Sequence, residues 1–363
     1  MRFERSSSSR YVVRSPVAST IWATWSGWDL AHAPGYRNGV IPPPESSREA
    51  RGARVAPCPP IGRECRFCRN VIVARRPSSR EPRGDHTVEP IRLRDRIIYE
   101  SADSVATMTL DWPEKGNLQD HEMVWAFDDA LTLAERDYDV KVVVIKANGK
   151  GFCAGHVGTG DYPEFNENRA RTGTTWTGQQ TLFVDPVLRL WEFPKPTIAA
   201  VHGYSAGCGT YWALLPDITI ASEEAWFQMP HVKLMGLPGA ETMMEPWLFM
   251  SWKRTYEYLY TRQKLTAAEA EHFNLVNRVV PRDELESTAA EMAAVIAEAP
   301  LTTLRATKLM VKRAWEMMGL RLHFQWSNDM VSLAAHHSDV QAQIYATTKE
   351  LIEKGRGTAP KIG

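Results

Sequence analysis

Two short glycine-rich stretches decide the fold: Gly151-Phe-Cys-Ala-Gly-His-Val-Gly158 and Val201-His-Gly-Tyr-Ser-Ala-Gly-Cys-Gly209. Each follows a run of mostly apolar residues, Val142–Lys146 before the first and Thr197–Val201 before the second. Short runs of this kind are typical of buried strands. Glycine and alanine let the backbone approach a ligand closely and turn its N–H groups toward it. Two such N–H groups that converge on one oxygen would form an oxyanion hole.

The chain from Ile91 onward alternates strand and helix patterns. Ile97–Glu100 and Ser104–Leu110 predict a pair of strands joined by a polar turn, and Asp120–Arg136 has the apolar spacing of an amphipathic helix. A helix over Gly207–Leu215 and a strand over Ile218–Ala221 continue the alternation, which predicts βαβ units and a mostly parallel sheet. Beyond Pro238 the patterns are largely helical, over Glu241–Ser251, Thr266–Phe273, Arg282–Glu298 and Leu301–Met318.

Composition excludes several classes of protein. The 363 residues carry a formal net charge of zero, so no global field favours nucleic acid or an acidic membrane surface. No apolar run is long enough to span a bilayer. No Gly-x-Gly-x-x-Gly opens a helix, so no dinucleotide is expected. We therefore expect a soluble protein that binds neither nucleic acid nor membrane.

Residues 1–90 differ in composition from the rest. They contain fifteen arginines, no lysine and eight acidic residues, a surplus of seven positive charges that the remaining 273 residues balance. The segment could be a disordered extension, a targeting segment, or the product of a start codon placed too far upstream. We favour disorder or the misplaced start, which implies a cytoplasmic protein; targeting would imply an organelle. The predicted organisation is this extension, an α/β core over 91–260 and a helical region over 261–363.

The five cysteines do not form a disulfide framework. Cys153 and Cys208 lie in the two glycine-rich loops, where small buried residues are expected. Cys65-x-x-Cys68, with Cys58 upstream, has zinc-like spacing but lacks a second matched pair. We therefore expect no metal site and no cofactor.

The two loops resemble those of the crotonase (enoyl-CoA hydratase/isomerase) family. The resemblance continues in Lys195-Pro-Thr-Ile-Ala-Ala-Val-His-Gly203, Asp217-Ile-Thr-Ile-Ala-Ser222 and Leu275-Val-Asn-Arg-Val-Val280. It implies a core of ββα units arranged in a spiral, followed by a C-terminal helical region. It also implies an enzyme, a lyase or isomerase of acyl-CoA metabolism, that stabilises a thioester enolate. CoA would be part of the substrate, and the subunits would form trimers or pairs of trimers.

The family pattern assigns the two oxyanion amides to His156, after Ala154 and Gly155, and to Cys208, after Gly207. Backbone donors tolerate changes of side chain, so a cysteine at the second position is acceptable. Lys146 and Lys150 flank the first loop. They are candidate contacts for the CoA phosphates, although solvated lysines at a strand end are an equally good interpretation.

The catalytic positions depart from the hydratase pattern. The two family glutamates that hold water correspond here to Tyr211 and His231. His231 could act as a general base or acid without a large pKa shift, and Tyr211 could bind a substrate oxygen. Glu241 could add a carboxylate near the pocket. Each has a simpler interpretation: a core histidine, a space-filling tyrosine, and an acid in the first turn of a helix.

Three functions follow from these residues. The first is an enoyl-CoA hydratase/isomerase-like enzyme. The second is hydrolysis of a CoA thioester or of a β-dicarbonyl C–C bond, with water activated by His231. The third is a non-catalytic family member that binds CoA esters.

Overall fold

The computed structural model describes residues 88–157 and 163–353. The predictions for residues 1–87 therefore lie outside the described part of the chain. The first described element, β1 (Val88–Leu93), begins three residues before the expected start of the core. Among the described residues, no helix combines the length and the apolar character needed to cross a membrane.

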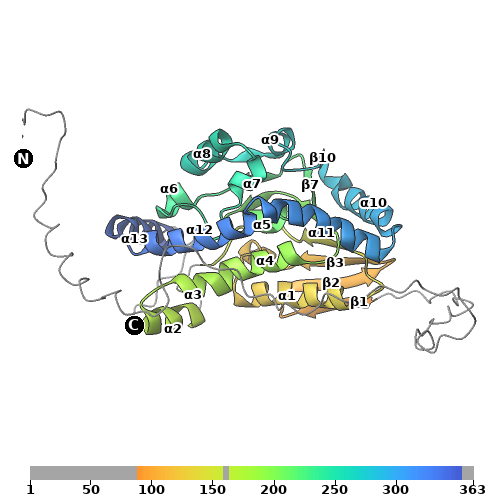
Figure 1. Ribbon diagram of the computed structural model, residues 1–363, viewed down its shortest axis with the longest axis horizontal. Helices are drawn as coiled ribbons and strands as arrows, with labels where there is room; N and C mark the ends of the chain where they lie inside the picture. Colours follow the sequence, from red (N-terminus) through yellow and green to blue (C-terminus); the bar gives the residue numbers. More distant parts are fainter. Residues whose placement is uncertain (1–87, 158–162, 354–363) are drawn as a thin grey trace, which may run out of the picture. The chain divides into compact units, whose positions relative to one another are not determined.

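A seven-stranded sheet forms the centre of the described chain (Figure 1). Its strand order is β1-β2-β3-β4-β5-β7-β10. The first three strands pair antiparallel, and the pairs from β3 to β10 are parallel, as the alternation of patterns predicted. After β1, the strands are β2 (Ile97–Ala102), β3 (Val105–Leu110), β4 (Val142–Ala147), β5 (Thr197–Val201), β7 (Ile218–Ser222) and β10 (Arg278–Val280).

The central strands are covered on both faces, which explains their continuous apolar sequence. Val143 and Ile145 of β4 belong to the larger core cluster, which includes α1 (His121–Arg136) and α5 (Gly209–Leu214). Val142 and Val144 point the other way, into a second cluster with α10 (Leu285–Ala297). The predicted strands Val142–Lys146 and Thr197–Val201 are confirmed, the second to the residue.

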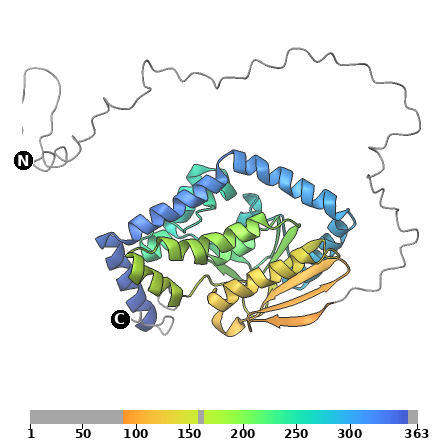
Figure 2. The ribbon, with the colours of Figure 1, turned by 60° about the horizontal axis from the view of Figure 1, so that its bottom comes forward.

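The predicted helix Asp120–Arg136 is also confirmed as α1. Asp120 caps it, because its carboxylate accepts a 2.8 Å hydrogen bond from the Met123 amide. The helix packs an apolar face against the sheet: Met123, Val124, Ala126, Phe127, Ala130, Leu131 and Ala134. Figure 2 shows α1 lying along the strands β1–β3.

A second, three-stranded sheet lies within the loop region. It has the order β6-β8-β9, formed by β6 (Tyr204–Ala206), β8 (Trp226–Gln228) and β9 (Leu265–Thr266). Strand β6 is the middle of the second glycine-rich loop, and Ser205 faces Phe227 across the sheet. The sequence did not predict β6, because three residues are too few for a periodic pattern.

The helical segment that precedes β5 packs against the second loop through Leu182 and Phe183, which contact Cys208. It runs from Trp176 to Glu192 as α3 (Trp176–Gln179), a π-helical segment (Gln180–Val184) and α4 (Asp185–Glu192).

The segment after Pro238 is mostly helical, as predicted. Its helices are α7 (Glu245–Phe249), α8 (Trp252–Thr261), α9 (Ala267–His272), α10, α11 (Leu301–Met317), α12 (Leu320–Ala335) and α13 (Ser338–Glu353).

Two details differ from the predicted elements. The expected helix Glu241–Ser251 is shortened to α7, because residues 241–244 form a turn and an irregular segment and Met250, with a left-handed φ of +47°, ends the helix. The division of the core at residue 260 stays an interpretation of the sequence, and α8 ends one residue beyond it. In Figures 1 and 2, α12 lies beside α3, and this contact joins the C-terminal helices to the rest of the fold.

Candidate active site

A buried asparagine, Asn117, anchors the first glycine-rich loop through hydrogen bonds. The Asn117 side-chain amide donates to the carbonyl oxygens of Asn148, Gly151 and Phe152, at 2.9, 3.1 and 3.2 Å. Its Oδ1 accepts a 2.8 Å hydrogen bond from the Trp112 amide. This side chain therefore fixes the loop that follows β4. Sequence analysis did not identify it, because its three acceptors are 31 to 35 residues away.

The backbone on either side of His156 pairs with Gln119. The Gln119 amide donates to the Gly155 carbonyl at 2.8 Å, and the Val157 amide donates to the Gln119 carbonyl at 3.1 Å. In this parallel bridge the His156 N–H points to the side opposite Gln119. Gly155 has a φ of +106°, a conformation that side chains rarely adopt, which explains the glycine at this position.

The second loop packs directly onto the first. The Ala206 amide donates to the Cys153 carbonyl at 2.9 Å. A β-carbon at Gly209 would lie only 2.5 Å from the same carbonyl oxygen, so no larger residue fits there without movement. The Gln119 side chain adds a 3.3 Å hydrogen bond to the Cys208 carbonyl. Gln119 thus connects both loops, a role that sequence analysis missed.

The predicted oxyanion residues lie together. A β-carbon at Gly207 would be 3.8 Å from Cα of Gly155 and 3.7 Å from Cε1 of His231. Within residues 88–157 and 163–353, neither the His156 nor the Cys208 amide donates to another protein group. Helix α5 begins at Gly209 instead of the predicted Gly207, so Cys208 is its N-cap. Both amides are therefore without a backbone acceptor among the described residues.

His231 is buried at the start of α6 (His231–Met235), with its Nδ1 2.8 Å from the Met229 sulfur. Burial, with a smaller effect of His156, lowers the pKa of His231 to about 3. The expectation that His231 would titrate without a large shift is therefore wrong. The imidazole is neutral at physiological pH and is a weak base.

Two buried carboxyls, Glu241 and Glu245, act electrostatically on Cys208. Burial raises the pKa of Glu241 and the pKa of Glu245 to about 7. Among the described residues, Glu241 Oε2, Glu245 Oε2 and Tyr211 Oη have no hydrogen-bond partner of normal geometry. Burial is the largest cause of the raised pKa of the Cys208 thiol, and the charge of Glu241 is the second largest. Burial is also the largest cause of the raised pKa of Tyr211, and the charge of Glu245 is the second largest. Both carboxyls therefore lie close enough to Cys208 and Tyr211 to affect them electrostatically.

This arrangement changes the interpretation of Glu241. Helix α7 begins at Glu245, so Glu241 is not the first-turn acid that the simpler interpretation assumed. Sequence analysis missed Glu245. The available signal was the spacing of two acids four residues apart within an otherwise apolar stretch, Glu241-Thr-Met-Met-Glu245.

The lysines and His202 lie at the edge of the site. Lys146 forms a 2.7 Å ion pair with Glu286 of α10, so its ammonium is already engaged. Lys150 is exposed beside the first loop. His202 Nε2 lies 2.9 Å from the Gly149 carbonyl, so His202 supports this loop.

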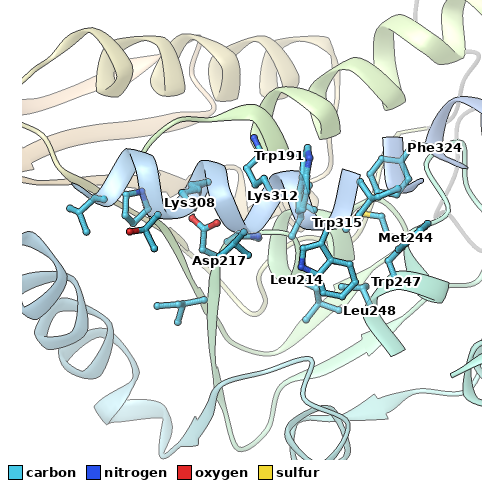
Figure 3. A pocket seen from close by; sticks show the side chains of 18 of the residues that line it. Trp191, Leu214, Asp217, Met244, Trp247, Leu248, Lys308, Lys312, Trp315 and Phe324 are labelled. Carbon is cyan, nitrogen blue, oxygen red and sulfur yellow. Dashed lines mark ion pairs between the residues drawn. The ribbon is translucent and has the colours of Figure 1, made fainter. Parts of the chain in front are cut away.

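A separate cavity of about 490 Å³ lies at the opposite edge of the sheet (Figure 3). Its wall includes Pro196 and Ile218, at the amino ends of β5 and β7, whereas the oxyanion loops follow the carboxyl ends of β4 and β5. Lys308 and Asp217 both line it and form a 2.7 Å ion pair. None of the predicted site residues lines this cavity.

The site thus combines two amides that have no backbone acceptor with buried carboxyls whose pKa burial raises to about 7. Such amides stabilise negative charge on a carbonyl oxygen, and such carboxyls can donate or accept a proton at neutral pH. The class of protein that these features suit is an enzyme acting next to an activated carbonyl.

Comparison with known proteins gives the family. Residues 100–356 match the enoyl-CoA hydratase/isomerase family model, and the chain belongs to this family. It is 27% identical over 263 residues to 2,3-dehydroadipyl-CoA hydratase of Escherichia coli, covering 72% of this chain and 99% of the relative. It is 30% identical over 222 residues to a probable enoyl-CoA hydratase, echA8, of Mycobacterium bovis, covering 61% and 83%.

Solved structures agree with the fold. The crystal structure of a probable enoyl-CoA hydratase from Mycobacterium smegmatis superposes with a TM-score of 0.61 at 35% sequence identity. The match covers 68% of this chain and 97% of that one. The predicted crotonase fold, an α/β core with a C-terminal helical region, is therefore confirmed.

Proposed function

We propose that this protein binds an acyl-CoA thioester and stabilises its enolate with the amides of His156 and Cys208. The observation that supports the proposal is the close approach of Gly155 and Gly207, the residues that precede the two proposed donors. Neither amide is used by another described residue. Loss of one such donor typically costs about 3 kcal/mol of transition-state stabilisation. Family membership supports a thioester as the ligand.

Glu241 is the proposed acid and base. Proton transfer is most effective when the pKa of the catalytic group is close to the working pH, and burial brings the pKa of Glu241 to about 7. Its Oε2 has no described hydrogen-bond partner and is free to meet a substrate proton. Tyr211 and Glu245 would support the buried site, and His231 would form a neutral wall beside the enolate.

The reaction we favour is migration of the double bond in an enoyl-CoA. One carboxyl can remove a proton from one carbon of the enolate system and return it to another, and the reaction needs no water. Hydration is the second candidate. It is favoured by the presence of Glu245 as a second buried carboxyl and by relatives named as hydratases. Hydrolysis through His231 has less support, because a pKa of about 3 makes it a poor base.

Product analysis tests these reactions. The full-length protein would be incubated with 2-enoyl- and 3-enoyl-CoA esters in H₂¹⁸O. The products would be separated by chromatography, and their molecular masses would be measured by mass spectrometry. We expect interconversion of the two esters without gain of mass. Gain of one labelled water with CoA still attached would replace isomerisation with hydration. Release of free CoA would establish a hydrolase, and binding without any product would establish a non-catalytic family member.

The C-terminal helices support the proposed assembly. Large apolar residues are exposed on α11 and α12, including Met310, Met317, Leu322, Trp326 and Leu333 at 59 to 83% of their surface. An apolar surface of this kind is typical of a subunit interface. We propose a homotrimer or a pair of trimers, in the cytoplasm, with Lys150 near the CoA phosphates. A monomeric mass by light scattering at micromolar concentration would contradict the assembly.

A further inference from the structure

Three side chains at the junction of the two loops have the composition of a metal site. A ring nitrogen of His156, the sulfur of Cys208 and a ring nitrogen of His231 all lie within 4.8 Å of one another. Cys208 and His231 are each 5% exposed, so water competes little for these atoms. Nitrogen and sulfur ligands in this combination suit Zn²⁺ and similar borderline ions.

The hydrogen bonds of the two imidazoles leave one nitrogen of each ring for a ligand. His156 Nδ1 lies 2.5 Å from the Val157 carbonyl, an acceptor, so this nitrogen carries the proton and Nε2 keeps its lone pair. His231 Nδ1 lies against the Met229 sulfur, which leaves Nε2 on the other side of the ring. A histidine ligand that donates its second N–H to a carbonyl is the usual arrangement around protein metals.

A bound ion requires one deprotonation and a small adjustment of the side chains. Cys208 would bind as the thiolate and release its proton to solvent. Zinc bonds of about 2.0–2.3 Å would require the three ligand atoms to approach by roughly 1 Å, within the reach of small side-chain rotations.

We propose that His156, Cys208 and His231 bind one zinc-class divalent ion, with the fourth position open to a water or another small ligand. His156 and Cys208 also carry the proposed oxyanion amides. Ion and thioester would therefore bind to the same junction, and each would affect the affinity of the other. The site is distinct from the cysteines of residues 1–90 and does not depend on which acyl reaction the enzyme performs.

Cobalt titration tests the proposal directly. The metal-free full-length protein would carry serine at Cys58, Cys65 and Cys68, so that only Cys153 and Cys208 remain as thiols. We expect one Co²⁺ per chain, with a sulfur-to-cobalt band in the near ultraviolet and the visible bands of a tetrahedral ion. Zn²⁺ should displace the cobalt and raise the melting temperature.

Matched variants locate the ion. Cys208→Ser should abolish the sulfur-to-cobalt band, and His231→Gln should weaken binding at least tenfold. Cys153→Ser should change neither result, because it removes a buried thiol of the first loop that is not part of the cluster. Circular dichroism without metal would verify that each variant is folded. Absence of a cobalt spectrum at millimolar Co²⁺, or a spectrum that survives in folded Cys208→Ser, would overturn the proposal.

Discussion

Replacement of Glu245 by glutamine should make the stability of the protein less dependent on pH. Burial raises the pKa of Glu245 from 4.5 to about 7 in the folded protein. Below pH 4.5 the carboxyl is protonated in both the folded and the unfolded chain, and burial has no electrostatic cost. Above pH 7 the folded protein holds a buried carboxylate. At about 1.4 kcal/mol per pKa unit, the cost reaches roughly 3 kcal/mol.

The free energy of unfolding of the wild type should therefore fall as the pH rises from 4.5 through 7, relative to Glu245→Gln. The difference between the two proteins should change by about 3 kcal/mol between pH 4 and pH 9. Any constant cost of burying the amide cancels in this comparison. The measurement is urea unfolding at a series of pH values, followed by circular dichroism.

Glu286 gives a control of opposite sign. Its pKa is lowered by the hydrogen bond from Lys146. The wild type should therefore lose stability relative to Glu286→Gln as the pH falls through the lowered pKa of Glu286. A difference between the wild type and Glu245→Gln that stays flat from pH 4 to pH 9 would refute the account of the buried carboxyls.

Three further substitutions test the support of the site. Gly155→Ala places a β-carbon 3.0 Å from the Ala206 carbonyl at a φ of +106°, and kcat/KM should fall at least tenfold in steady-state assays. Gln119→Leu removes the hydrogen bond to the Cys208 carbonyl. We expect kcat to fall about tenfold while KM stays nearly unchanged. A change of similar size in both kcat and KM would indicate general damage to the site instead. The Lys195 ammonium donates to three backbone carbonyls at 2.5 to 2.8 Å, and Lys195→Met leaves these carbonyls without a donor. The free energy of unfolding, measured by thermal unfolding, should therefore fall by about 3 kcal/mol or more. An unchanged melting temperature would contradict this role.

The sequence predicted the parts of the fold that repeat a local pattern. Strand β5 and helix α1 were predictable because burial imposes a period of two or 3.6 residues on their apolar side chains. Strand β6 was not, since its three residues gain their partner, β8, only through the tertiary fold. Helix α7 was predicted four residues too early, because residues 241–244 form a turn and an irregular segment where their spacing predicted a helix.

The candidate site was predictable to a similar degree. Glycine spacing was enough to place His156 and Cys208 together, because backbone geometry depends on few residues. The properties of side chains were harder to predict. The low pKa of His231 and the raised pKa of Glu245 result from burial, which depends on the tertiary fold. The same is true of Gln119, whose contact with the Cys208 carbonyl spans 89 residues.

Exchange of the α-hydrogens of a saturated acyl-CoA in D₂O tests the central claim most directly, because it needs only enolate formation and proton transfer. The account predicts that the wild-type protein incorporates deuterium, as measured by mass spectrometry. Glu241→Gln should slow this exchange by about 10²- to 10⁴-fold, whereas His231→Gln should slow it far less. An absence of exchange by the wild type, or an equal rate in folded Glu241→Gln, would contradict the assignment of an enolate-stabilising site with Glu241 as its acid and base.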